Sequence, residues 1–87
     1  MTYAVRIVPS AAKELERLSF ENQRRIDSRI SDLASNPRSP GSTPLKGGMR
    51  GLWRTRVGDY RIIYEIRDSE LVVVVAKIGH RREIYRD

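Results

Sequence analysis

Residues 53–64 decide the fold, and they read WRTRVGDYRIIY. Residues alternate in character on both sides of Gly58 and Asp59, which is typical of two strands joined by a two-residue turn. Glycine at the first central position favours a type II′ hairpin turn, and such a turn fixes the strand register. The predicted cross-strand pairs are Val57 with Tyr60, Arg56 with Arg61, Thr55 with Ile62, and Arg54 with Ile63.

This register divides the hairpin, predicted at residues 51–57 and 60–67, into two faces. One face is apolar and should form the core, with Trp53, Thr55, Val57, Tyr60, Ile62, Tyr64 and Ile66. The other face carries Arg54, Arg56 and Arg61. Arg56 and Arg61 are directly opposed, with Cα atoms about 4.5 Å apart, and like charges so placed cost about 0.2–1 kcal/mol. We expect an anion to offset that cost; the alternative is a solvated face whose arginines pair with Glu65 or with other acids.

Two amphipathic helices should precede the hairpin. A short strand at residues 2–8 ends at Pro9 and Ser10, and Ser10 is positioned to cap a first helix whose apolar stripe runs from Ala11 to Leu18. A second helix is predicted from about residue 20 to residue 35, with apolar residues four and three apart and with Glu21/Arg25 and Arg29/Asp32 at pairing distance. Asn36 and Pro37 end it, and residues 36–50 form one long loop.

Two more strands are predicted after the hairpin. Asp68 and Ser69 indicate a second two-residue turn into a strand at residues 71–78, which is apolar on both faces and therefore central. Extending the register through that turn places Ala76 opposite Arg61, and so leaves space above the arginine. Gly79 should break this strand, and residues 81–86 form a last one. The fold class is α+β: a single domain over residues 1–87, in the order β-α-α-β-β-β-β, with an antiparallel sheet and an αα-hairpin on one face.

The composition points to an anionic partner. The 87 residues contain 17 Lys plus Arg against 11 Asp plus Glu, for a net charge of +6, and 14 of the 17 basic residues are arginine, whose guanidinium group matches phosphate oxygens. The absence of cysteine excludes a disulfide scaffold and fits a reducing cytoplasm. The longest apolar run, six residues, is far short of the 20 or so that a membrane span needs. We expect a cytoplasmic protein.

The chemistry available to these residues is restricted. Acidic residues are scattered, so no metal site is predicted, and His80 is the only histidine, so a two-histidine acid–base pair is not available. The reaction still open to these residues is cleavage of RNA without a metal. In that reaction the substrate's own 2′-OH attacks the phosphorus while arginines stabilise the transition state. The C-terminal residues could contribute to it, with Arg81, Glu83 and Tyr85 on one side of the predicted last strand; a frayed basic tail is the alternative reading.

Three stretches resemble the RelE family of toxins, within the RelE/ParE superfamily. They are Leu45-Lys46-Gly47, residues 53–64 with their Gly-Asp-Tyr-Arg element, and residues 78–85 with their Gly-His-Arg-Arg-x-Ile-Tyr element. The resemblance spans nearly the whole chain. It implies a microbial-RNase-like sheet of strand order 1-5-4-3-2, which would place residues 81–86 between residues 2–8 and residues 71–78.

The resemblance also implies a function. It indicates the toxin of a type II toxin–antitoxin pair, a ribosome-dependent endoribonuclease that cleaves mRNA without a cofactor and is neutralised by an acidic or amphipathic antitoxin. By position, Arg61 is similar to the arginine that stabilises the phosphate, Arg81 to the one that assists the leaving group, and Tyr85 to a tyrosine that stacks on a base or orients the 2′-OH. Arg54, Arg56, Lys46 and Arg82 are the expected substrate-binding residues.

The general base stays open. Arg54 and Arg56 stand where a well-known member carries lysines, and because guanidinium groups stay protonated, both should act only electrostatically. His80, Tyr85 and Glu83 are the candidates for proton transfer. Two other functions compete with RNA cleavage: a ParE-like poison of DNA gyrase, and a non-catalytic nucleic-acid-binding or co-repressor module that reaches operator DNA in complex with the antitoxin.

Overall fold

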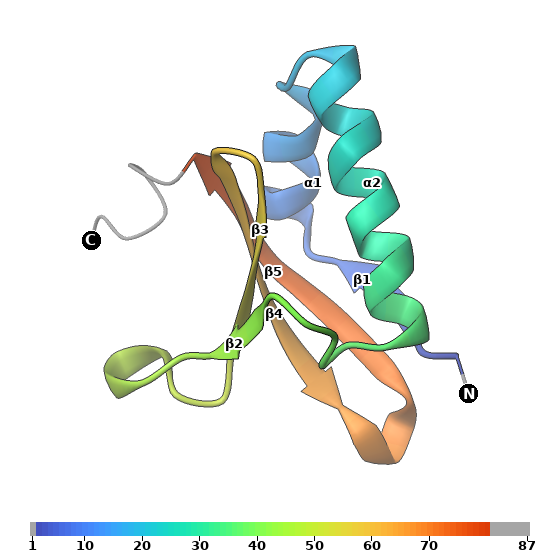
Figure 1. Ribbon diagram of the computed structural model, residues 1–87, viewed down its shortest axis with the longest axis vertical. Coiled ribbons are helices and arrows are strands. Elements are labelled where there is room, and N and C mark those ends of the chain that lie inside the picture. The colour runs from blue at the N-terminus through green and yellow to red at the C-terminus, as the bar shows by residue number, and fades with distance from the viewer. Residues whose placement is uncertain (1, 81–87) are drawn as a thin grey trace.

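The computed structural model describes residues 2–80, which form two helices packed against one face of a five-stranded sheet (Figure 1). The strands are β1 (Ala4–Ile7), β2 (Ser42–Pro44), β3 (Trp53–Val57), β4 (Tyr60–Arg67) and β5 (Val72–His80). The helices are α1 (Pro9–Glu16) and α2 (Phe20–Ser35), and two 3₁₀ turns, η1 (Gly47–Met49) and η2 (Asp68–Glu70), lie in the connections. This is the two-layer α+β architecture predicted from the sequence.

The helices begin and end for local reasons. The prediction that Ser10 caps α1 was wrong: the helix starts at Pro9, whose fixed φ suits the first helical position, and Val8 is the N-cap without a side-chain bond. Ser19 caps α2, and its hydroxyl accepts a hydrogen bond from the Asn22 backbone N–H at 3.2 Å. Neither of these helices is long and apolar enough to span a bilayer within residues 2–80.

The strand order is β1-β5-β4-β3-β2, and one of its four pairings is parallel. The predicted sheet was wholly antiparallel, but Ala4–Ile7 runs parallel to Val72–Val75. The register leaves no strand between β1 and β5, so the placement of residues 81–86 there was wrong; the structure of those residues lies outside the described part of the chain. The short edge strand β2, antiparallel to β3, was not predicted.

The hairpin of β3 and β4 has the predicted register, with Arg56 opposite Arg61 and Val57 opposite Tyr60. Gly58 has φ +60°, as the expected turn requires. The next connection differs, because η2 and a left-handed Leu71 (φ 53°) replace the expected two-residue turn. A bulge between Ile63 and Tyr64 then leaves Ala76 without an opposite residue. The residue facing Arg61 is therefore Gly79, and β5 continues through it to His80.

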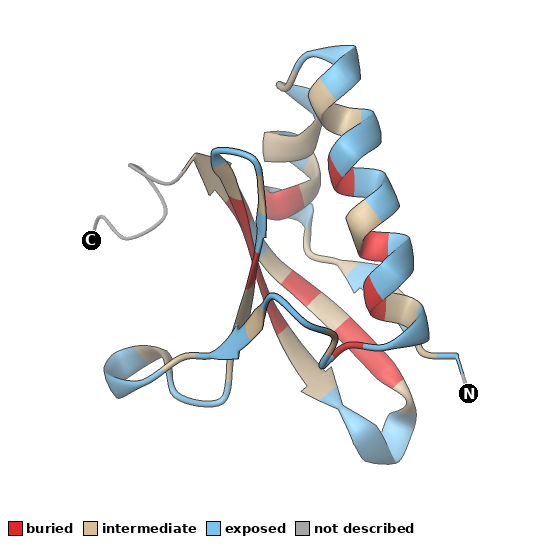
Figure 2. Ribbon diagram, in the orientation of Figure 1, coloured by how far each residue is buried: buried red, intermediate tan, exposed pale blue. Residues whose placement is uncertain are grey.

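The core lies between the helices and the sheet, where Figure 2 shows the buried positions of α2 turned toward the strands. Helix α2 contributes Ile26, Ile30 and Leu33 to the core. The sheet contributes side chains of β4 and β5 that face the helices: Ile62, Tyr64, Val73, Val75 and Ile78. Trp53, Val57, Tyr60 and Ile66 pack at the margin of this cluster. The apolar face predicted from the hairpin is thus the core face.

A polar network fixes the chain that leaves α2. The buried Tyr64 hydroxyl donates a hydrogen bond to the Pro37 carbonyl at 2.7 Å. Arg38 donates to both carboxylate oxygens of Asp68, at 3.0 and 2.8 Å, and the Tyr3 hydroxyl donates to the same carboxylate at 2.7 Å. The hydrogen bonds from Arg38 and then from Tyr3 lower the pKa of Asp68 to about 2. These contacts hold the loop beside the sheet, where β2 forms.

Candidate nucleic-acid interface

The face of the sheet away from the helices carries the arginines predicted from the hairpin. We call it the open face, and its basic residues on the three strands β3 to β5 are Arg54, Arg56, Arg61, Arg67 and Lys77, of which Arg67 is paired with Glu65. Lys77 is exposed and pairs with Ile63, which in turn pairs with Arg54 on its other side. Sequence reasoning missed Lys77, although it is the single charged residue in an otherwise apolar strand.

Arg61 is the most unusual residue of this face. Its side chain is 7% exposed, and its one hydrogen bond in the described structure joins Nη1 to the Tyr60 carbonyl at 3.2 Å. Its Nε is buried without a hydrogen-bond partner. Burial of a guanidinium group without a carboxylate is costly, because the charge loses its hydration without gaining a counter-ion.

The surroundings of Arg61 increase that cost. Arg56 lies directly opposite Arg61 on β3 and is exposed. Arg54, two residues before Arg56 on the same strand, is half-buried. Glu65, the acid expected to neutralise these arginines in the alternative reading, instead pairs with Arg67 at 2.6 Å. No ion pair between residues 2–80 involves Arg56 or Arg61. An anionic ligand would supply the missing charge.

Gly79 is the cross-strand neighbour of Arg61 on β5. It faces Arg61 on the neighbouring strand and has no side chain to cover the guanidinium group. The sequence reasoning expected a small neighbour here but assigned it to Ala76, because it did not foresee the four-residue connection and the bulge. A small neighbour therefore does face Arg61, but it is Gly79 and not Ala76.

His80 lies on the other face of the sheet. It pairs with Tyr60, whose ring packs against the core, and the two rings meet edge to face with centroids 5.7 Å apart. Because side chains alternate along a strand, His80 and Arg61 project from opposite faces. The structure therefore does not bring this imidazole together with the arginines.

The other predicted site residues lie away from the strands. Lys46 is exposed in the loop between β2 and β3, which extends on the side of the sheet away from the helices (Figure 1). Arg81, Arg82, Glu83 and Tyr85 lie outside the described residues. Within residues 2–80, no three His, Asp or Glu side chains gather where they could bind a metal ion.

Comparison with known proteins gives a consistent result. The family model described as "ParE toxin of type II toxin-antitoxin system, parDE" matches residues 5–85. Toxin RelG of Mycobacterium tuberculosis is 32% identical over 87 residues, with 99% of each chain covered. Toxin RelE of the same organism is 34% identical, over 97% of this chain and 87% of the relative.

Solved structures show the same fold. The toxin–antitoxin complex RelBE2 from Mycobacterium tuberculosis contains a chain that superposes with a TM-score of 0.85 at 28% identity, covering 93% of this chain and all of that one. The archaeal RelE–RelB complex from Pyrococcus horikoshii OT3 gives a TM-score of 0.82 at 30% identity, over 95% of this chain and 99% of that one.

Proposed function

Because this chain belongs to the ParE toxin family of type II toxin–antitoxin systems, we propose that it is a toxin of the RNA-cleaving kind. In this proposal the protein enters the ribosome in the cytoplasm, cleaves mRNA and stops translation. No metal or cofactor takes part. The relatives named RelG and RelE support this reading, as does the cationic open face.

The observation that carries the proposal is the buried, unpaired guanidinium group of Arg61 opposite Arg56. Such a group lowers the stability of the protein, and a bound anion would offset that cost. In a site of low dielectric constant, a fixed cation interacts more strongly with phosphate than it would in water. Negative charge grows on the phosphate as the transition state forms, so Arg61 would stabilise that state more than the ground state.

The reaction that fits is transesterification by the RNA itself. The 2′ oxygen attacks the adjacent phosphorus, forming the O2′–P bond as the P–O5′ bond breaks. The 2′-OH proton passes to a general base, and a proton donor protonates the leaving 5′ oxygen, leaving a 2′,3′-cyclic phosphate and a 5′-OH. We assign Arg61 to the nonbridging phosphate oxygens and Arg54 and Arg56 to the electrostatic binding of the strand, with Lys46 and Arg82 as further substrate contacts.

The remaining roles in the reaction are assigned to the C-terminal residues. Arg81 would assist the departure of the 5′ oxygen, and Tyr85 would orient the 2′-OH or stack on a base. His80 projects from the face opposite Arg61, so Tyr85 or Glu83 is the better candidate for the general base.

The proposed partners follow from charge. An acidic or amphipathic antitoxin segment laid over the open face would neutralise its arginines and exclude RNA. The structures that resemble this chain include toxin–antitoxin complexes, which supports a cognate antitoxin here. Contact with operator DNA would then occur through the antitoxin.

The second candidate function is poisoning of DNA gyrase. The observation in its favour is the family model itself, which is described by the name of the ParE toxins. The two functions leave different traces in cells, since a gyrase poison traps protein–DNA complexes and leaves mRNA intact.

Primer-extension mapping of mRNA ends after induction tests the proposal. We expect new 5′ ends within translated regions and growth arrest from the wild-type protein, and neither from Arg61→Ala. Arg67→Ala is the matched control, because Arg67 lies on the same strand but is exposed and paired with Glu65; it should stay toxic. Trapped gyrase–DNA complexes without new mRNA ends would refute RNA cleavage, and full toxicity of a folded Arg61→Ala would refute the phosphate site.

A further inference from the structure

Lys77 is the one lysine among the basic residues that strands β3 to β5 present on the open face; the others are arginines. It pairs with Ile63 across the β4–β5 ladder, and Arg61 pairs with Gly79, two residues further along β5. Residues two apart on a strand project from the same face of a sheet. Lys77 and Arg61 are therefore diagonal neighbours on the open face, a relation in which residues lie about 7–8 Å apart, within reach of long side chains.

The four positions around this diagonal carry only two charged side chains. Lys77 and Arg61 occupy opposite corners, and Gly79 and Ile63 occupy the other two. Gly79 has no side chain and Ile63 is 1% exposed, so neither places a polar group between the two cations. Lys77 is therefore the charged residue of β5 that an anion bound beside Arg61 would meet.

No acid neutralises Lys77 within residues 2–80. Its side chain is exposed and forms no ion pair in that part of the chain. Glu65, the acid on the same face of β4, pairs with Arg67 at 2.6 Å. Like charges on neighbouring strands disfavour the fold unless an anion offsets them. A phosphate bound at Arg61 would supply that charge to both cations.

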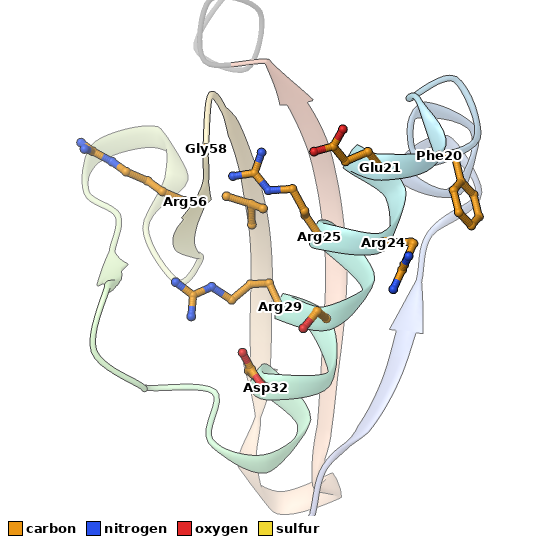
Figure 3. Close-up of a pocket in the computed structure, with 10 residues that line it drawn as sticks. Phe20, Glu21, Arg24, Arg25, Arg29, Asp32, Arg56 and Gly58 are labelled. Carbon is orange, nitrogen blue, oxygen red and sulfur yellow. The ribbon is translucent and has the colours of Figure 1, made fainter.

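The helix side of the sheet adds no proton donor to this face in the described part of the chain. Figure 3 shows Arg25 and Arg29 projecting from α2 toward the β3–β4 hairpin, whereas Arg56 projects away from α2. His80 also lies on the helix side, against the ring of Tyr60. Among the basic residues of β3 to β5 on the open face, the lysine is thus the one with a proton that it can release.

Lysine and arginine act differently on a phosphate. A guanidinium group binds nonbridging oxygens through several N–H groups but keeps its protons, whereas an ammonium group can transfer one to a basic oxygen. The 5′ oxygen of RNA becomes such an acceptor as its bond to phosphorus breaks. The buried guanidinium group of Arg61 and the exposed ammonium group of Lys77 therefore suit different oxygens of one phosphate.

We propose that Lys77 is a catalytic residue whose ammonium group donates a proton to the leaving 5′ oxygen. The inference rests on the RNA cleavage proposed above. As the P–O5′ bond breaks, its electron pair moves to O5′, which takes a proton from Nζ of Lys77. The products are the 5′-OH and a neutral amine, which solvent water protonates again. Arg61 holds the nonbridging oxygens during this step, and Arg81 assists by its charge alone.

A sulfur atom in place of the bridging 5′ oxygen tests this role directly. Thiolates are far weaker bases than alkoxides, so a sulfur leaving group departs without a proton donor. The substrates are ribosome-bound mRNAs with oxygen or sulfur at the mapped cleavage position, and kcat and KM of the full-length toxin are measured on both. The variant Lys77→Arg keeps the positive charge but has no proton to transfer.

The two substrates should respond differently to this variant. On the oxygen substrate, Lys77→Arg should lower kcat about 10²–10⁴-fold, the usual contribution of a proton donor, with little change in KM. On the sulfur substrate it should cleave at close to the wild-type rate. Lys77→Met, which also lacks the charge, should show the same recovery of kcat with a higher KM. Urea denaturation should show both variants folded, because Lys77 is exposed.

Two controls separate proton donation from other effects. Lys13→Arg makes the same change at an exposed lysine of α1, on the helix side, and should cleave both substrates as the wild type does. Arg61→Ala should cleave neither, since the charge on the phosphate must be stabilised whichever atom leaves.

Each outcome decides a different point. Full activity of Lys77→Arg on the oxygen substrate, beside an inactive Arg61→Ala, overturns the role of Lys77 and leaves RNA cleavage intact. Equal losses on the oxygen and sulfur substrates also overturn it, and show that Lys77 only binds the strand. Absence of cleavage of either substrate by the wild type refutes the proposed function, and this inference with it.

Discussion

Replacement of Arg61 by methionine should stabilise the protein while it removes toxicity. Methionine has a similar length and no charge. The substitution would relieve the desolvation of a guanidinium group that is 7% exposed, together with its repulsion from Arg56, worth about 0.2–1 kcal/mol. Against this stands one hydrogen bond to the Tyr60 carbonyl, worth about 1 kcal/mol.

The net change follows from these contributions. Replacing buried ionic groups by apolar residues of similar volume stabilises some proteins by about 1–4 kcal/mol. After loss of the hydrogen bond we expect a gain of about 1–2 kcal/mol for Arg61→Met. For a domain of this size, each kcal/mol shifts Tm by about 4–8 °C, so Tm should rise by about 4–16 °C.

Urea denaturation followed by the fluorescence of Trp53, the single tryptophan, measures the gain. Arg56→Met is the control, because Arg56 is exposed and has no desolvation to relieve. It should change the free energy of unfolding by no more than about 1 kcal/mol, the size of the repulsion. A loss of more than 1 kcal/mol in Arg61→Met would show that the guanidinium group serves the fold, and the reasoning from its burial would then be refuted.

Three other perturbations test the fold and its electrostatics. Tyr64→Phe should cost about 1–2 kcal/mol in urea denaturation, because it leaves the Pro37 carbonyl without its 2.7 Å hydrogen bond. Gly58→Ala should cost about 1–2 kcal/mol in the same assay, since φ is +60° there. The hydrogen bonds from Arg38 and then from Tyr3 lower the pKa of Asp68 in the folded state to about 2, below its unfolded value near 3.8. Asp68 should therefore stabilise the fold above about pH 3.8, and this stability should be lost as the pH falls toward about 2. In acid titrations of the free energy of unfolding, Asp68→Asn should flatten this part of the curve.

Each of these perturbations has its control or contrary result. Tyr60→Phe removes a hydroxyl that makes no hydrogen bond within residues 2–80 and should be close to neutral, so equal losses at Tyr64 and Tyr60 would contradict the first prediction. Glu70 lies in the same 3₁₀ turn and forms no ion pair within residues 2–80, so equal flattening of the curve by Asp68→Asn and by Glu70→Gln would contradict the prediction for Asp68. An unaltered free energy of unfolding in Gly58→Ala would contradict the prediction for that variant.

Local rules were enough to predict the hairpin and both of its faces. Gly58 fixed the turn, the turn fixed the Arg56–Arg61 pair, and alternation then separated the arginines from the core residues. The two helices could be predicted equally well, because the spacing of apolar residues and the end of a helix at Asn36 are properties of short segments.

Features that depend on distant packing were not predicted. The left-handed Leu71 and the bulge beside Ala76 carry no clear sequence signal, yet together they shift three residues along β5 relative to Arg61. The placement of Gly79 opposite Arg61 and of His80 beside Tyr60 follows from that shifted register. Glu21/Arg25 and Arg29/Asp32 have helical neighbour spacings on α2 but form no ion pairs within residues 2–80, because spacing alone does not fix the rotamers of long charged side chains in water.

The most direct test of the central claim uses ribosomes programmed with an mRNA that carries a single 2′-deoxynucleotide at the mapped cleavage position. Product ends would be measured with and without a chelator of divalent ions that leaves the ribosomes intact. If the RNA's own 2′-OH is the nucleophile and Arg61 acts without a metal, the deoxy substitution should abolish cleavage at that position, and the chelator should leave cleavage of the normal mRNA unchanged. Cleavage of the deoxy substrate, or its loss from normal mRNA on chelation alone, would contradict the mechanism.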